Sequence, residues 1–186
     1  WLLFSVALVT YGLTVEPTAS YWDAGEYIST SAKLQVGHPP GAPFFQMMGA
    51  VFSLFASNNE SIAIAVNFLS VVSSAFVILF LFWSTTLFLK KISKKNNFAN
   101  DTNILLSSSI GALAFTFSDS FWFNAVETEV YALAMLFLSA TFWCGLRWEK
   151  DFDNKRGDKW LLLICFLIGL SFGVHFMAIL TIPAIA

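Results

Sequence analysis

Long, nearly uninterrupted runs of apolar residues limit what this chain can fold into more than any other feature of its sequence. Residues 61–89 and 130–148 are such runs, and about 18 or more consecutive apolar residues predict a helix that crosses a membrane. Only 12% of the 186 residues are charged, against roughly 25% in ordinary soluble domains. A soluble core can bury one such helix, but not several in a chain of this length. The sequence therefore predicts an all-α integral membrane protein.

Apolar sequence reaches both ends of the chain, so we interpret residues 1–186 as a single transmembrane domain, truncated at both ends, from the N-terminal part of a longer protein. The expected spans are residues 1–15, 61–89, 103–117, 130–148 and 160–174, with residues 176–186 either continuing the fifth span or starting a sixth. The apolar stretch at 44–57 is short for a span, and we expect it to lie along the membrane surface.

Basic residues fall almost entirely in two connections between the expected spans. Of ten Lys and Arg, four lie within residues 90–95 and five within residues 147–159. The positive-inside rule places both connections in the cytoplasm. The opposite connections, residues 16–60 and 119–129, hold seven acidic residues and a single lysine. We therefore expect the functional face to be acidic and external.

The first polar motif on that face is Tyr-Trp-Asp-Ala-Gly-Glu at residues 21–26. If residues 22–35 are helical, Asp23 and Glu26 are three residues apart and share one helix face. Paired carboxylates at a membrane surface can supply a general base or bind a metal. The local alternative is that Asp23 caps the helix and Glu26 interacts favourably with the helix dipole.

His38 follows in the segment Val-Gly-His-Pro-Pro-Gly-Ala-Pro at residues 36–43. The two prolines disfavour a helix at His38, so we expect two surface helices separated at this point. A histidine before prolines is usually a turn residue with a hydrogen-bonded ring. The alternative is that His38 binds substrate, or joins Asp23 and Glu26 as a ligand of a divalent cation.

The second polar motif, residues 118–129, combines aromatic with acidic side chains. The aromatic residues are typical of an interfacial belt. Asn124 and Glu127 could form a capping box, and Glu127 and Glu129, two residues apart, do not share a helix face. Acidic groups at the end of a span are costly unless they are paired or hydrated. That cost favours a substrate-binding role for Asp119, Glu127 and Glu129.

The third candidate is His175, which lies in apolar sequence just after Gly173. If the chain reverses here, His175 lies at the outer surface, level with the two acidic motifs. If it does not, His175 is a polar residue inside the membrane. Either position favours a functional role over simple packing. Gly169 and Gly173 are four residues apart, a spacing that allows close contact between helices.

Three segments, DAGEY…KLQVGHPPGAPFF, FWFNAVETEVYAL and GLSFGVHFMAILTIP, together resemble an uncharacterised family of bacterial membrane proteins related to a transmembrane protein O-mannosyltransferase of animals. The order of a span, a long outer loop with an acidic motif, two surface helices and further spans resembles the GT-C class of membrane glycosyltransferases. The resemblance covers essentially the whole chain. It implies a GT-C-like multi-span helical bundle with juxtamembrane helices in the first outer loop.

The resemblance also implies an activity: an inverting glycosyltransferase that moves a sugar, with mannose as a candidate, from a polyprenyl-phosphate carrier to a Ser or Thr hydroxyl of a protein, or to another acceptor. It implies Asp23 as the general base with Glu26 as runner-up or partner, and His175 near the lipid phosphate. The implied location is the bacterial inner membrane, with the active face periplasmic. The implied partners are the bilayer, the lipid-linked sugar and an acceptor protein, with no nucleic acid. No cofactor is required by this scheme, although Asp23, Glu26 and His38 could bind a divalent metal.

Two other classes of function remain open from the residues. A transporter or flippase of a lipid-linked or polar substrate would use the acidic residues and His175 as proton or substrate sites. A non-catalytic membrane subunit would tolerate neutralisation of Asp23, Glu26 and His38 together, whereas an enzyme should not.

Overall fold

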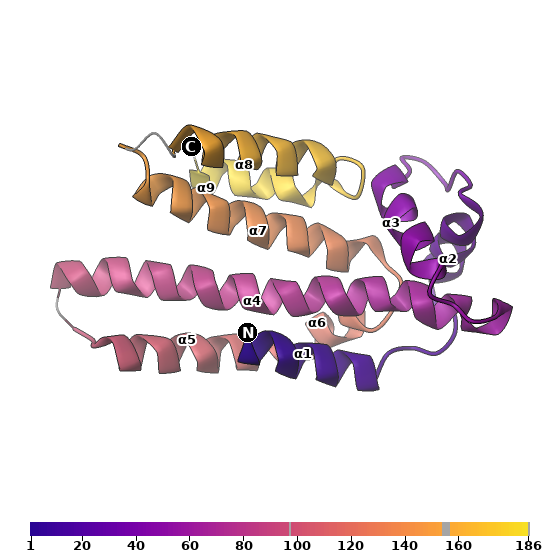
Figure 1. The fold of residues 1–186 in the computed structure, drawn as a ribbon, viewed down its shortest axis with the longest axis horizontal. Helices are drawn as coiled ribbons and strands as arrows, with labels where there is room; N and C mark the ends of the chain where they lie inside the picture. The colour runs from indigo at the N-terminus through magenta and orange to yellow at the C-terminus, as the bar shows by residue number, and fades with distance from the viewer. Residues whose placement is uncertain (97, 154–156, 186) are drawn as a thin grey trace.

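A computed structural model describes residues 1–96, 98–153 and 157–185, and every regular element in that part of the chain is helical (Figure 1). The prediction of an all-α fold is confirmed. The helices are α1 (Leu2–Leu13), α2 (Ala24–Lys33), α3 (Pro43–Ser53), η1 (Asn59–Ser61), α4 (Ile62–Asn96), α5 (Asp101–Thr116), α6 (Asp119–Ala125), α7 (Val130–Lys150), α8 (Gly157–Ser171), η2 (Phe176–Thr181) and α9 (Ile182–Ile185).

Two helices among the described residues, α4 and α7, are long and apolar enough to cross a membrane. Together with the preceding η1, α4 contains the span expected at 61–89, and α7 contains the span expected at 130–148. Helices α5 and α6 make a third candidate if counted as one broken span, bent by 68° at the break. Helices α1 and α8, with 12 and 15 residues, are shorter than the ~20 residues of a typical crossing.

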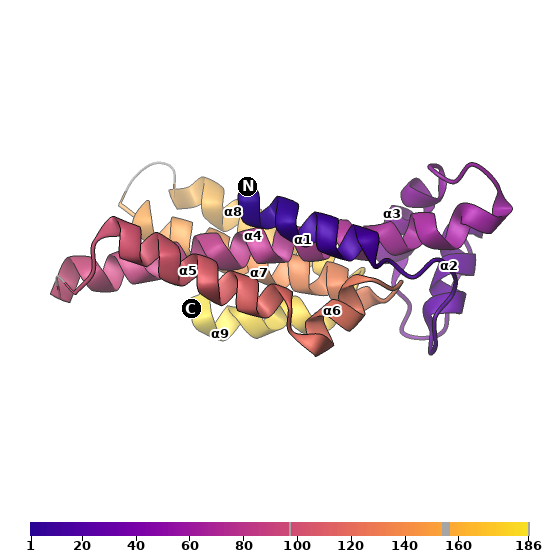
Figure 2. The same cartoon turned by 90° about the horizontal axis from the view of Figure 1, so that it is seen from below.

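Helix α4 is the centre of the bundle. Helices α1 and α5 pack along one side of it and α7 along the other, with α8 outside α7 (Figures 1 and 2). Small side chains let neighbouring backbones approach α4 closely: Ala75 of α4, Ala7 of α1 and Ala112 of α5 are at most 1% exposed. The surface of the bundle remains strongly apolar, as expected of a protein surrounded by lipid.

The two ends of the bundle differ in charge. The α4–α5 and α7–α8 connections, which carry the basic residues, lie at the same end (Figure 1). There Lys90 pairs with Asp101 at 3.3 Å and Lys91 with Glu149. Of the nine basic residues expected at this end, Lys155 and Arg156 lie outside the described residues. The surface helices α2 and α3 lie at the opposite end, beside the α6–α7 connection.

Candidate functional site

Helix α2, with Asp23 at its N-cap position and Glu26 in its first turn, is anchored to the bundle through one face. Ala24 and Ile28 are 0% and 8% exposed, and α2 packs against α3 and α4. The helix ends at Leu34, which adopts a left-handed conformation with φ 49° and ψ 48°. This residue redirects the chain so that His38 returns to the first turn of α2.

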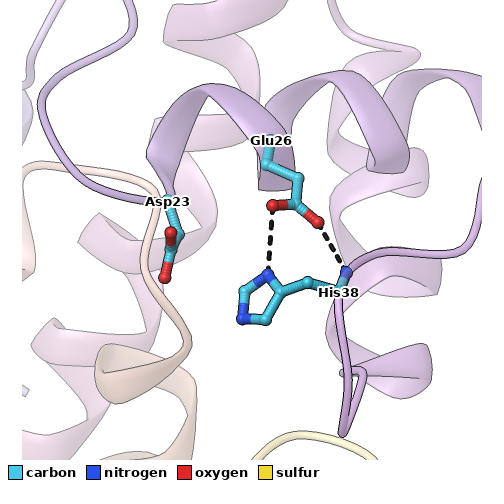
Figure 3. A group of neighbouring side chains, drawn as sticks. All are labelled: Asp23, Glu26 and His38. Carbon is cyan, nitrogen blue, oxygen red and sulfur yellow. Dashed lines mark hydrogen bonds and ion pairs between the residues drawn. The ribbon is translucent and has the colours of Figure 1, made fainter.

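Glu26 and His38 form the best-defined contact of the site (Figure 3). The backbone N–H of His38 donates to Oε1 of Glu26 at 2.6 Å, and Nδ1 of His38 lies 3.0 Å from Oε2. The hydrogen bond from the His38 backbone is the main reason that the pKa of Glu26 is lowered, and the ring adds to it. The hydrogen bond and negative charge of Glu26 raise the pKa of His38 in turn. The expected turn at His38 therefore also joins its imidazole to a carboxylate.

Asp23 occupies the N-cap position of α2, but its side chain makes no capping hydrogen bond. The local alternative for Asp23, helix capping, is therefore not what its carboxylate does. That carboxylate is exposed and lies beside the imidazole of His38 (Figure 3). Because Nδ1 of His38 is engaged by Glu26, Nε2 is the remaining ring nitrogen.

These three side chains also form a candidate metal site. One ligand atom from each of Asp23, Glu26 and His38 can be chosen so that all lie within 4.8 Å of one another. Two carboxylates and one imidazole suit a divalent transition metal. Both oxygens of Glu26 accept hydrogen bonds from His38, so an ion at this site would share the Glu26 carboxylate with His38.

The α6–α7 connection adds two buried carboxylates to this end of the bundle. Glu127 and Glu129 are 4% and 7% exposed. Burial raises the pKa of Glu127, and it raises that of Glu129 to about 7, with the negative charges of Asp23 and Glu127 adding to the effect on Glu129. The backbone N–H groups of Val130 and Asp23 partly offset the shift of Glu129 by hydrogen bonding. Glu129 therefore lies directly against the backbone of Asp23.

His175 is brought to the same end by a reversal of the chain. Helix α8 ends at Ser171, and His175 is the N-cap residue of η2. The carbonyl of Gly173 accepts hydrogen bonds from the N–H groups of Phe44, at 2.8 Å, and Phe45, at 3.3 Å. These bonds attach the turn to the start of α3. Of the two positions considered for His175, the structure shows the one at the outer end.

Two tyrosines also belong to the site, although the sequence did not single them out. Tyr27 has its pKa raised to about 12, mainly by burial and then by the charges of Glu129, Asp23 and Glu26. The rings of Tyr131 and His175 are 5.6 Å apart. A signal was present, since each tyrosine follows a motif glutamate by one or two residues. Tyr27 thus lies among the acidic residues, and Tyr131 lies beside the imidazole of His175.

Asp119 lies apart from the other candidate residues, and the expected capping box between Asn124 and Glu127 does not form. Asp119 is exposed in the first turn of α6, and no interaction found among the described residues links it to Asp23, Glu26 or His38. The Asn124–Glu127 capping box is wrong, because α6 ends at Ala125 and the side-chain amide of Asn124 donates to the Ser120 carbonyl. A capping role therefore does not explain why Glu127 is buried.

Chemically, the site can accept a proton and hold cationic or hydroxyl groups. Asp23 is an exposed carboxylate within reach of a substrate, and Glu129 titrates near neutral pH. Positive charge is scarce: Lys33, in the last turn of α2, is the single Lys or Arg in the outer segments. Other donors toward an anion in these segments are the imidazoles, the hydroxyl groups and the backbone N–H groups.

Comparison with known proteins relates the chain to one family. Residues 23–186 match the family model of the protein O-mannosyl-transferase TMEM260 N-terminal domain. The protein O-mannosyl-transferase tmem260 of Dictyostelium discoideum is 30% identical over 158 residues, 83% of this chain and 18% of that protein. The protein O-mannosyl-transferase TMEM260 of Mus musculus is 27% identical over 170 residues, 91% of this chain and 22% of that protein. The chain thus spans about a fifth of the length of these relatives, and no solved structure gives a significant match.

Proposed function

The chain belongs to the family of the protein O-mannosyl-transferase TMEM260 N-terminal domain, and from this premise we propose that it forms the catalytic face of a membrane glycosyltransferase of the GT-C type. The proposed reaction moves a sugar, with mannose as first candidate, from a polyprenyl-phosphate carrier to a Ser or Thr hydroxyl of a protein. The site lies at the end of the bundle opposite the basic connections, which the positive-inside rule assigns to the cytoplasm. In a bacterial cell, that end faces the periplasm.

The observation that carries the proposal is the state of Asp23. Its carboxylate is exposed, makes no capping bond and lies beside a His38 ring held by Glu26. An acceptor hydroxyl that attacks the anomeric carbon must lose its proton, and Asp23 is placed to take it. The bond between the anomeric carbon and the phosphate oxygen breaks, and its electron pair leaves with the phosphate. Attack opposite the leaving group inverts the anomeric centre.

The leaving phosphate needs donors rather than an acid, because it departs as a stable anion. His38 and His175 are the candidates at this end, and the raised pKa of His38 favours its charged form. Glu129 supports the backbone of Asp23. Glu127, Glu129 and the exposed Asp119 of α6 are the proposed acceptors for sugar hydroxyls. We propose that the acceptor protein binds at the same end of the bundle.

A divalent metal at Asp23, Glu26 and His38 is part of the proposal as an additional ligand of the site. When bound, such an ion would neutralise charge on the phosphate of the donor. Asp23, Glu26 and His38 would hold the ion.

Two adjoining grooves support a lipid-linked donor. A groove of about 420 Å³ beside the site is lined by Tyr131, Asn124 and Met177, and by Phe115 and Met135. The last two residues also line an apolar groove of about 360 Å³ between α4, α5 and α7. The two together form an apolar path from the site toward the middle of the membrane, where the isoprenoid chain of a donor would lie.

The test uses the full-length protein in nanodiscs, a panel of radiolabelled polyprenyl-phosphate sugars and a protein acceptor extract. We expect label on protein with the parent enzyme and at least a hundredfold loss with Asp23→Asn. Asp158→Asn, an exposed residue in the first turn of α8 at the basic end, is the charge-matched control. Transfer that survives Asp23→Asn would remove Asp23 as the base. Accumulation of unchanged substrate in sealed vesicles would instead favour a transporter.

A further inference from the structure

We propose that Asn67 is a positioning residue that clamps together the two loops carrying the acidic site. The expected effect on catalysis rests on the proposed function, whereas the clamp itself rests on the hydrogen bonds of Asn67. Asn67 lies in α4, the central helix, and is 1% exposed. It carries a polar amide in a buried position, and such a group needs hydrogen-bond partners.

The side-chain amide of Asn67 has partners on both loops. Its Nδ2 donates to the carbonyl of Glu16 at 2.6 Å and to that of Thr18 at 3.0 Å. Its Oδ1 accepts from the hydroxyl of Thr128, a residue that is 0% exposed. Both amide hydrogens and the amide oxygen are therefore in use. No other type of side chain of this size offers two donors and an acceptor in one plane.

The two loops joined by Asn67 are those that carry the site. Thr18 precedes Asp23 in the connection from α1 to α2, and Thr128 stands between Glu127 and Glu129. A backbone bond from the N–H of Glu16 to the carbonyl of Val126, at 2.9 Å, runs alongside the amide. The two loops are thus bound to each other and, through Asn67, to the most deeply packed helix of the fold.

The clamp acts on the site through Asp23 and Glu129. The Glu129 carboxylate lies against the backbone N–H of Asp23. The distance between the two loops therefore determines the position of Asp23, the proposed base. Without the amide, two carbonyls and one hydroxyl lose their partner in a place with little access to water. A displacement of about 1 Å in a catalytic group can cost about a hundredfold in rate. Asn67 touches no reacting atom in this scheme and acts only through its neighbours.

The experiment compares Asn67→Leu, Asn67→Asp and Ser70→Ala in the full-length protein in nanodiscs. Ser70 is the matched control, since it lies one turn further along α4, is 1% exposed, and has a hydroxyl without a hydrogen-bond partner. Hydrogen exchange is measured in the peptides containing Glu16 and Thr128. We expect exchange to rise at least tenfold at the Glu16 amide with both Asn67 variants and to stay unchanged with Ser70→Ala. Unchanged exchange at Glu16 with both Asn67 variants would overturn the clamp.

Kinetics then test the positioning role. We expect kcat for sugar transfer to fall at least tenfold with Asn67→Leu while KM for the acceptor changes less than threefold. Thr128→Ser keeps the hydroxyl and is expected to retain transfer and exchange protection, whereas Thr128→Val is expected to lose both in part. Normal kcat in a variant with increased exchange would overturn the positioning role. If the parent protein transfers no sugar, the proposed function fails, and hydrogen exchange alone decides on the clamp.

Discussion

Both oxygens of the Glu26 carboxylate are engaged by His38, one by its backbone N–H at 2.6 Å and the other by Nδ1 at 3.0 Å. A single carboxylate thus fixes both the path of the chain at residue 38 and the orientation of the imidazole. Asp23, three residues earlier, is left with an exposed carboxylate. The two acidic residues of one motif therefore have different tasks: Glu26 holds His38, and Asp23 is available to a substrate.

Replacing Glu26 with Gln should uncouple His38 from this support. A carboxamide has one oxygen where the carboxylate has two, and it carries no charge. Glu26 is charged above its lowered pKa, and His38 is charged below its raised pKa. The wild-type ion pair therefore exists only between these two pKa values. We expect E26Q to lose about tenfold in transfer rate and its alkaline loss of activity to begin at lower pH than in the parent. A pH–rate profile from acid to alkaline conditions measures this. An unchanged alkaline limb would show that His38 does not depend on Glu26.

Glu129 should make the stability of the protein fall as pH rises. Its pKa is about 7 in the folded protein, against 4.5 for an ordinary glutamate. Because the folded state binds this proton more tightly, the stability linked to it is fully present below pH 4.5 and is lost as pH approaches 7. The shift corresponds to an upper limit on the order of 3 kcal/mol.

The matched variant is Glu129→Gln, which keeps the size of the side chain and removes its titration. We expect melting temperatures of the parent in detergent to decline between acidic and neutral pH, and those of E129Q to vary less. Parallel curves for the two proteins would contradict the raised pKa of Glu129.

Gly173 should not tolerate even a methyl group. A Cβ at this position would lie 2.7 Å from Cβ of Phe44 and 3.3 Å from its backbone nitrogen, which donates to the Gly173 carbonyl. Gly173→Ala must therefore displace the start of α3, at a cost of about 1–3 kcal/mol. Gly169→Ala is the control, since nothing lies within 4 Å of its Cβ position. We expect a lower melting temperature and weaker transfer for G173A alone. Equal melting temperatures for the two variants would argue against the close contact.

Removal of divalent metal tests the proposed ligand set of Asp23, Glu26 and His38. We expect a chelator to lower transfer by at least tenfold and added Mn²⁺ to restore it. Binding is followed separately by the loss of the free Mn²⁺ signal in electron paramagnetic resonance, so that the result does not depend on activity. His38→Ala should weaken Mn²⁺ binding, whereas Asp158→Asn, at the opposite end, should not. Full transfer in the presence of chelator would exclude the metal.

Much of this architecture could be read from the pattern of residues. Apolar runs indicated the positions of α4 and α7, and Pro39–Pro40 indicated the break between the surface helices. The basic residues at 90–95 and 147–159 indicated which connections meet at one end of the bundle. These features depend on local composition and helical periodicity, which a sequence displays directly.

Other expectations failed because more than one local structure fitted the same residues. Asn124 and Glu127 had the spacing of a capping box, yet α6 ends before Glu127 and leaves it buried. Gly169 and Gly173 had the spacing of a helix contact, but only Gly173 is close to another element. The spacing of residues shows which local structures a segment can form, but it does not identify the element that packs against the segment.

The sequence by itself determined that the chain is helical, suited to a membrane and acidic at one end, because hydrophobicity and charge act residue by residue. It also indicated that Asp23 and Glu26 lie on the same side of the helix start, since residues three apart are neighbours on a helix surface. Only the tertiary structure decided that Asn67 reaches Thr128, 61 residues away, and that Glu129 lies against Asp23. Such contacts depend on how whole helices pack around α4, and helical periodicity identifies the face that a helix buries without identifying its partner.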